Sequence, residues 1–390
     1  MAPVNIGNNL LGSHTAIAFR EHRNAKPPPG YQLITGHIIW DVKMEDLRRK
    51  ARYVADGNKT ETPKTLTYAS VVSRESVRIA MTLAALNDLE IKAADIQNAY
   101  LTAPCSEKIC ICVGDEFGED SGKLIIIVRV LYGLASSGAS FRNHLASCIH
   151  ELGYESCLAD RDLWIKPMVR PEDGHKYYAY VLLYVDDVLC IHHDATKALK
   201  EIDWYFKMKK GSIGDPSIYL GAKVVKTTLE NGVEFWGLSS SKYVQEAVRN
   251  VDEYLQKNYD SSLPKKVKTP FPNDYRPELD VTPELCPKEA SYFHSGIGIL
   301  RWIVELGRVD IITEVSLLSS HLALPREGHL EVLYRVFAYL KNKHNAVMLF
   351  DPSYPPINME TFKVCDWKEF YGDAKEPIPP NAPEPRGKEV

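Results

Sequence analysis

Two adjacent carboxylates, Asp186 and Asp187, stand inside an apolar run, the segment YAYVLLYVDDVLCIH at residues 178–192. A run of this length, rich in β-branched and aromatic residues, is typical of buried strand. Burying an unpaired carboxylate is costly, and neighbouring like charges repel each other. Two explanations are open. The pair forms the exposed turn of a hairpin, where Asp is favoured, or a divalent cation such as Mg²⁺ offsets its charge.

Catalysis with two metal ions, in which one ion activates an attacking hydroxyl and the other stabilises a leaving oxygen, needs a further carboxylate from elsewhere in the chain. Asp95 is the best candidate. In EIKAADIQNAYL, residues 90–101, Ile91, Ala93 and Asp95 alternate on one face of an expected strand. The alternative is that Asp95 only terminates that strand.

The composition excludes several classes of protein. The chain has 390 residues, 45% hydrophobic and 25% charged, which is enough for two or three subdomains with cores of their own. The net charge of −4 gives no global signature of nucleic-acid binding, so any basic surface must be local. No apolar stretch predicts a membrane span, and the N-terminus does not predict secretion. The eight cysteines lack zinc-finger spacing, so free thiols are expected.

Alternating and helical periodicities predict the elements that would position the three carboxylates. A helix is expected over residues 70–88, with Ser73 as its cap, and another of about 15 residues after a glycine-punctuated loop at 132–138. A hairpin of strands 178–183 and 188–192 would carry the acidic pair. Further strands are expected at 36–42, at 123–131 and within 218–238, where Asn231 and Gly232 indicate a turn. A helix after residue 240 and three more between 288 and 343 follow.

Four motifs occur in order: DIQNAYL (95–101), LYGL (131–134), YVDD (184–187) and YLGAKV (219–224). Together they resemble the reverse transcriptase region of copia-type LTR retrotransposon polyproteins. The resemblance extends from about residue 36 to residue 390, and includes LRWIVELGR (300–308) and PREGH (325–329), which are similar to the segment between polymerase and RNase H. It implies an α+β fold: a right-hand polymerase of fingers, palm and thumb, with an antiparallel palm sheet backed by helices, then a helical C-terminal part.

The same resemblance implies a domain organisation. A lead-in would occupy residues 1–30, the fingers and palm 31–238, and the thumb or connection helices 239–345. Residues 346–390 would form an extended Pro-rich tail leading toward an RNase H domain, which the family begins about where this chain ends.

The resemblance also implies the reaction: an RNA-directed DNA polymerase, a nucleotidyltransferase in which a primer 3′-hydroxyl attacks the α-phosphate of a deoxynucleotide. Asp95, Asp186 and Asp187 would be the catalytic carboxylates and, with the backbone carbonyl of Ile96, would ligate two Mg²⁺ or Mn²⁺ ions. The expected partners are a primer–template of RNA or DNA and deoxynucleoside triphosphates. The expected location is the cytoplasm, in particles of the parent element, with nuclear entry and oligomeric state left open.

Further site residues follow from the same motifs. Tyr100 would lie under the sugar and exclude a 2′-hydroxyl, although it also suits a core position. Nucleotide-binding roles are also implied for the basic residues Lys50 and Arg52, otherwise a solvated strand face, and for Gly133, a point of close packing. Primer–template contacts are expected at Tyr132, Tyr184 and Lys223.

The loop after LYGL departs from the family pattern. Family members commonly carry basic residues near Ala135 and near Ala139 or Ser140, whereas here the first is Arg142. This leaves a second hypothesis, a catalytically impaired reverse transcriptase-like relic or domesticated fragment that at most binds nucleic acid. A third, an unrelated α+β protein with a structural metal at the acidic hairpin, does not explain the ordered motifs.

Overall fold

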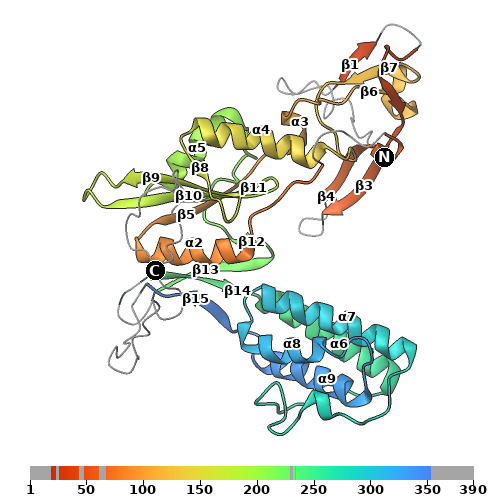
Figure 1. Ribbon diagram of the computed structural model, residues 1–390, viewed down its shortest axis with the longest axis vertical. Helices are drawn as coiled ribbons and strands as arrows, with labels where there is room; N and C mark the ends of the chain where they lie inside the picture. The colour runs from red at the N-terminus through yellow and green to blue at the C-terminus, as the bar shows by residue number, and fades with distance from the viewer. Residues whose placement is uncertain are drawn as a thin grey trace, which may run out of the picture. The chain divides into compact units, whose positions relative to one another are not determined.

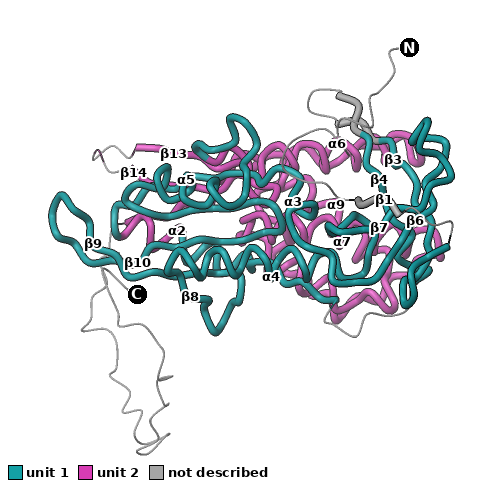
Figure 2. Tube along the Cα trace, turned by 90° about the horizontal axis from the view of Figure 1, so that it is seen from above, with its two compact units in different colours: residues 1–80, 87–215, 379–390 teal, residues 81–86, 216–378 magenta. Residues whose placement is uncertain are grey.

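The structure is a computed structural model that describes residues 19–22, 26–43, 48–60, 67–228, 232 and 234–352. The chain divides into two compact units (Figure 2). Unit 1 comprises residues 1–80, 87–215 and 379–390, and unit 2 comprises residues 81–86 and 216–378. None of the helices in the described ranges combines the length and apolar character needed to cross a bilayer. Every cysteine in those ranges is a free thiol, as expected.

An antiparallel five-stranded sheet is the centre of unit 1. Its strand order is β5 (Glu90–Asp95), β11 (Asp187–His192), β10 (Lys176–Tyr184), β9 (Leu163–Val169) and β8 (Glu155–Ser156). The helices α4 (Ser137–Glu151) and α5 (Ala195–Tyr205) lie on one face of this sheet, and the part of α2 (Arg74–Leu86) that belongs to unit 1, residues 74–80, lies on the other (Figure 1). Because both faces are covered, β10 and β11 are apolar almost without alternation, as the sequence predicts.

The two helices predicted at 70–88 and after the loop at 132–138 are confirmed, with somewhat different ends. α2 is shorter than the expected 70–88, and its N-terminus is capped as predicted, since the Ser76 N–H donates to Ser73 Oγ at 3.1 Å. α4 buries Phe141 and Leu145 on its inner face. α5, which is not predicted from the sequence, is capped by Asp194, whose carboxylate accepts the Lys197 N–H at 2.9 Å.

Two smaller sheets complete unit 1. One has the order β1 (Phe19–His22), β7 (Leu124–Ile127), β6 (Ile109–Cys112) and β2 (Gln32–Ile34), with β2 and β6 parallel. The other is the hairpin β3 (Gly36–Lys43) and β4 (Arg48–Ala55). Short helices α3 (Ala99–Thr102), η1 (Gly57–Lys59) and η2 (Asp115–Asp120) connect the strands. The strand expected at 123–131 is therefore too long, because β7 ends at Ile127, which pairs with Phe19 of β1.

Unit 2 contains an antiparallel sheet and a group of helices. The strand order is β12 (Ile218–Tyr219), β13 (Ala222–Thr228), β14 (Glu234–Ser239) and β15 (Val347–Phe350). The helices are α6 (Ser241–Tyr259), α7 (Pro287–Glu305), α8 (Ile312–Ser319) and α9 (Glu327–Asn342), with short turns η3 (Pro277–Leu279) and η4 (Val309–Ile311). The helices predicted after residue 240 and between 288 and 343 are thus confirmed. They share a buried core that includes Val244, Leu300, Leu333 and Phe337.

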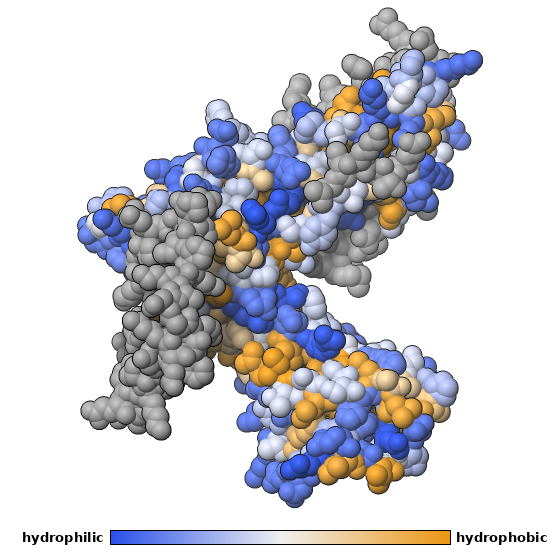
Figure 3. Space-filling view, in the orientation of Figure 1, coloured by the Kyte–Doolittle hydropathy of each residue, from blue (hydrophilic) through white to orange (hydrophobic). Residues whose placement is uncertain are grey.

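Parts of the sequence-based expectation fall outside the described residues, among them Asn231 of the expected turn and the Pro-rich stretch 377–385. β15 lies at the start of the region expected to be a tail, where it pairs with β14. The surface of the helical part of unit 2 carries apolar patches (Figure 3), and its exposed apolar residues include Val309 and Ile312. The mixed α+β content with antiparallel sheets agrees with the fold class predicted from the sequence.

Candidate active site

The acidic pair lies at the tip of the β10–β11 hairpin. Tyr184 pairs with Asp187, so the turn contains only Val185 and Asp186. The sequence-based strands 178–183 and 188–192 were therefore too short, and Asp187 belongs to β11 rather than to the turn. Val185 has φ of +56°, a left-handed conformation that is strained for a β-branched residue but that tight two-residue hairpin turns require. Strain of this kind is found where a turn must present a functional side chain.

Strand pairing brings the third carboxylate to the same place. Asp95 is directly opposite Asp187 in the β5–β11 ladder, and the Ile96 N–H donates to the Asp186 carbonyl oxygen at 2.9 Å. Asp95, Asp186 and Asp187 are all partly exposed. The pKa of Asp187 is raised to about 6, chiefly by desolvation and then by the charges of Asp186 and Asp95. The structure thus gathers the three predicted carboxylates at one end of the central sheet.

Sequence reasoning missed a lysine in this cluster. Lys209 Nζ forms an ion pair with Asp95 Oδ2, and the Lys209 N–H donates to the Asp95 carbonyl oxygen at 2.8 Å. The other carboxylate oxygen, Asp95 Oδ1, is buried and has no hydrogen-bond partner in the described structure. Lys209 stands in the basic segment KMKKG (207–211), but nothing in its spacing relates it to a residue more than a hundred positions away.

The donor set suits a hard divalent cation, since carboxylate oxygens are the ligands that Mg²⁺ prefers and one of them is buried without a partner. With Asp95 paired to Lys209, no group of three or more His, Cys, Asp or Glu residues in the described ranges is already arranged to hold a metal ion. The carbonyl ligand role of Ile96 stays a prediction. Its side chain is fully buried, and its backbone forms a bridge to Met208.

Aromatic and basic side chains lie beside the carboxylates. The rings of Tyr100 and Tyr132 are 4.8 Å apart, and Arg52 Cζ lies 5.7 Å from the Tyr132 ring centroid. The pKa of each tyrosine is raised, first by burial and second by the negative charge of Asp186. Both tyrosines are therefore within electrostatic reach of the acidic turn, and three residues expected to contact nucleotide or primer–template form one cluster.

Gly133 has a structural reason to be glycine. Its φ is +95°, and an added Cβ would lie 2.1 Å from the carbonyl oxygen of Ala55. The Ala55 N–H donates to the Tyr132 carbonyl oxygen at 2.8 Å, so the backbone of this loop lies directly against β4. This close approach positions Tyr132 beside Arg52. The nucleotide contact expected of Gly133 stays a prediction.

For the remaining predicted site residues, the structure gives little more than the element in which each one lies. Lys50 lies in β4, but its side chain is outside the described part. Tyr184 ends β10 and is partly buried, and Lys223 is exposed on β13 in unit 2. Of the positions that the family commonly makes basic, Ala135 is exposed; of the alternatives Ala139 and Ser140 for the second position, Ala139 is buried in the first turn of α4 and Ser140 is partly buried. A basic side chain at 139 would have to be accommodated in that interior.

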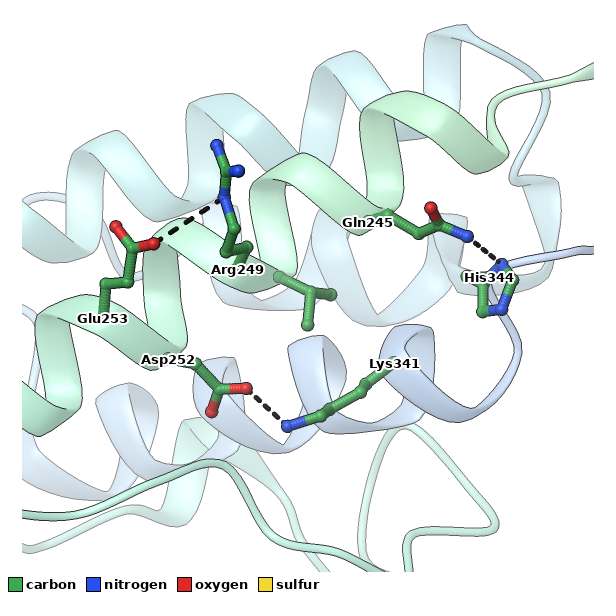
Figure 4. A pocket seen from close by; sticks show the side chains of 7 residues that line it. Gln245, Arg249, Asp252, Glu253, Lys341 and His344 are labelled. Atoms are coloured by element: carbon green, nitrogen blue, oxygen red, sulfur yellow. Dashed lines mark hydrogen bonds and ion pairs between the residues drawn. The ribbon is translucent and has the colours of Figure 1, made fainter.

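Unit 2 contains a separate groove between α6 and α9, of about 270 Å³ (Figure 4). Its charged groups are engaged with one another: Lys341 pairs with Asp252, and Arg249 with Glu253 at 3.7 Å. Gln245 Nε2 lies 2.9 Å from His344 Nδ1. These mutually satisfied groups do not resemble the repelling carboxylates of the hairpin, so the candidate active site is the acidic cluster of unit 1.

The raised pKa of Asp187 predicts a pH dependence of stability. Its folded-state pKa of about 6 lies above the ordinary 3.8, so the folded protein binds an extra proton between these values. The resulting stabilisation is complete below about pH 4 and is lost as the pH rises through about 6. We expect the thermal midpoint of metal-free wild type, relative to Asp187→Asn, to fall over this window. A midpoint difference that stays constant from pH 4 to pH 7 would rule the effect out.

Comparison with known proteins gives a consistent result. The family described as reverse transcriptase (RNA-dependent DNA polymerase) matches residues 22–266. The chain is 26% identical over 325 residues to the "Retrovirus-related Pol polyprotein from transposon TNT 1-94" of Nicotiana tabacum, covering 79% of this chain and 23% of that protein. It is 24% identical over 373 residues to the corresponding polyprotein from transposon RE1 of Arabidopsis thaliana, covering 92% of this chain and 24% of that protein.

A third relative is more distant. The "Truncated transposon Ty1-A Gag-Pol polyprotein" of Saccharomyces cerevisiae is 22% identical over 335 residues, covering 83% of this chain and 26% of that protein. The chain therefore spans about a quarter of the length of these polyproteins. The resemblance to copia-type polyproteins that the sequence motifs indicate is confirmed, and the matched region contains all three carboxylates of the cluster.

Proposed function

Because the chain belongs to the reverse transcriptase (RNA-dependent DNA polymerase) family, we propose that it is an RNA-directed DNA polymerase that adds deoxynucleotides to a primer 3′-hydroxyl. The observation that carries the proposal is the convergence of Asp95, Asp186 and Asp187 at one end of the central sheet. Burial and the negative charges of Asp186 and Asp95 raise the pKa of Asp187, so three ionised carboxylates at this place are favourable only when cations join them. A nucleotidyl-transfer site requires the same arrangement.

The carboxylates of Asp95, Asp186 and Asp187, with the carbonyl of Ile96, would hold two Mg²⁺ or Mn²⁺ ions. Such ions activate the attacking hydroxyl and neutralise the charge that develops on the phosphate oxygens. The fold of the chain holds the three carboxylates in position. The β5–β11 register fixes Asp95 against Asp187, and the strained Val185 turn presents Asp186. The unpartnered Asp95 Oδ1 supports a ligand role, since a buried carboxylate oxygen is costly without a partner.

The cluster beside the carboxylates would bind the incoming nucleotide. Arg52, with Lys50 on the same strand, would neutralise the triphosphate, to which guanidinium groups bind well. The Tyr132 ring beneath Arg52 fixes the guanidinium, and Tyr100 would lie under the deoxyribose. Tyr184 and Lys223 would contact primer–template, mainly at its backbone, because a copying enzyme must accept any sequence.

The proposal also assigns the sheets and helices to the parts of a right-hand polymerase. In this proposal the sheet of β5, β11, β10, β9 and β8 is the palm, the sheets formed by β1–β4, β6 and β7 belong to the fingers, and α6–α9 are the thumb or connection helices. By lineage, the location would be the cytoplasm, in particles of the parent element, as part of a polyprotein like those of the transposons.

Replacing Tyr100 tests the sugar-binding role. The Tyr100 ring packs on Tyr132 and on Phe141, with centroids 5.9 Å apart in the second pair, so its position is fixed. We expect Tyr100→Val to incorporate ribonucleotides at least about tenfold more efficiently relative to deoxynucleotides, a change of about 1.4 kcal/mol in discrimination. Single-nucleotide incorporation with each triphosphate measures this ratio. An unchanged ratio in an active variant would remove Tyr100 from the sugar site.

Primer extension tests the function itself. The purified chain is given a DNA primer annealed to an RNA template, with all four deoxynucleotides and either Mg²⁺ or a chelator. Templated extension that requires Mg²⁺ would support the polymerase. A folded protein that binds primer–template but extends nothing would favour the non-catalytic relic, for which the absence of basic residues at Ala135 and Ala139 is the motivating feature. In an active polymerase and in a non-catalytic relic alike, primer–template binding should weaken as the salt concentration rises.

A further inference from the structure

The segment that follows α5 places the ammonium group of a lysine beside the proposed metal site. Residues 207–214 run along the outer edge of β5, on the side opposite β11. The Gln97 N–H donates to the Lys207 carbonyl oxygen at 2.8 Å, and Ala93 and Gly214 exchange two backbone hydrogen bonds of 2.8 and 3.1 Å. The Asp95 N–H donates to Ser212 Oγ at 3.1 Å. This pairing holds the Lys209 backbone beside Asp95.

The side chain of Lys209 is placed as a counter-ion, since its ammonium pairs with Asp95 Oδ2. The Lys209 side chain is 49% exposed and that of Asp95 is 31% exposed, so the ammonium is able to leave for solvent. Its backbone is fixed, but its long side chain has no second ion pair in the described structure that would hold it in place.

We propose that Lys209 is an internal counter-ion of the metal-free site, and that a divalent cation must displace its ammonium from Asp95 in order to bind. The inference rests on the proposed function, because it concerns the same carboxylates. It accounts for two observations together. Asp95 Oδ2 already has a cationic partner, and no group of acidic or other ligand side chains in the described ranges is arranged to receive a metal.

Two opposite effects follow. In the metal-free protein Lys209 reduces repulsion among Asp95, Asp186 and Asp187, so it stabilises the fold. Toward the metal it competes for Asp95, so it weakens binding. Removing its charge should therefore destabilise the metal-free protein and tighten metal binding. A residue with only a structural role would not produce both changes.

The test is Mn²⁺ binding to the full chain without nucleic acid, measured by isothermal titration calorimetry. Lys209→Met removes the charge and keeps most of the stem. We expect it to lower the Mn²⁺ dissociation constant by about tenfold. Lys209→Arg keeps the cation and should bind as wild type does. The control is Lys210→Met, which removes an equal charge from an exposed neighbour that makes no ion pair with Asp95.

Thermal unfolding supplies the second readout. In chelator, Lys209→Met should melt below wild type and below Lys210→Met, and saturating Mn²⁺ should raise its midpoint by more than it raises that of wild type. If Lys209→Met binds Mn²⁺ with wild-type affinity, or if Lys210→Met gains as much affinity as Lys209→Met, the counter-ion role of Lys209 is wrong while the proposed metal site stands. Absence of Mn²⁺ binding in every variant would overturn the proposed metal site as well.

Discussion

Asp186→Asn should lower the rate of primer extension by at least about a thousandfold, while the protein stays folded. The side chain keeps its size, and Asn is well tolerated in a tight turn, so the hairpin persists. What is lost is one anionic oxygen donor at the tip of the turn. Because Asp186 helps to raise the pKa of Asp187, removing its charge also relieves repulsion in the metal-free cluster. The thermal midpoint should therefore not decrease.

The matched control is Asp173→Asn, which makes the same change in the turn between β9 and β10. Asp173 is 51% exposed there and pairs with Arg170 at 3.3 Å. Single-turnover extension of a DNA primer on RNA compares the two variants with wild type, and circular dichroism monitors folding. Wild-type rates in both variants would remove Asp186 from the chemistry, whereas an equal loss in both would indicate a general defect of the sheet rather than a role of Asp186.

Gly133→Ala should destabilise the protein by about 3 kcal/mol or more. Two costs combine at this position. The φ of +95° disfavours any side chain, and the new Cβ would lie 2.1 Å from the Ala55 carbonyl oxygen, a backbone atom that moves only if β4 moves. Moving β4 would also separate Arg52 from Tyr132, so nucleotide affinity should fall along with stability.

Gly174→Ala separates the two costs. Gly174 also has a positive φ, +70°, but nothing lies within 4 Å of its added Cβ. It should lose only about 1 kcal/mol, the cost of the conformation itself. Urea denaturation of the metal-free proteins gives both values. Equal denaturation midpoints for the two variants would show that the close approach of Gly133 to β4 does not occur in solution.

Local patterns in the sequence predict the separate parts of the acidic site but not their meeting. The apolar run around Asp186 and Asp187 specifies a hairpin, and alternation through Asp95 specifies a strand end, because both signals come from neighbouring residues. Their juxtaposition came from the family resemblance, which the comparison confirms and the β5–β11 register agrees with. The error of one residue in the turn reflects the register of Tyr184 with Asp187, which no local signal fixes.

Long-range contacts could not be predicted in the same way. Lys209 meets Asp95 only because residues 207–214 pair along the edge of β5. Arg52 meets Tyr132 only because β4 lies against the loop at Gly133. The burial of Ala139 likewise depends on how α4 packs, so its departure from the family's basic pattern could not be interpreted from sequence alone.

Counting bound Mn²⁺ decides whether Asp95, Asp186 and Asp187 form a two-metal polymerase site. The chain is assembled with an RNA template, a DNA primer ending in a dideoxynucleotide and the next correct deoxynucleotide, and bound Mn²⁺ is measured by electron paramagnetic resonance. We predict two ions per complex in wild type and fewer in Asp186→Asn. A wild-type complex that holds primer–template and nucleotide without two ions, or an Asp186→Asn complex that keeps both, would contradict the assignment.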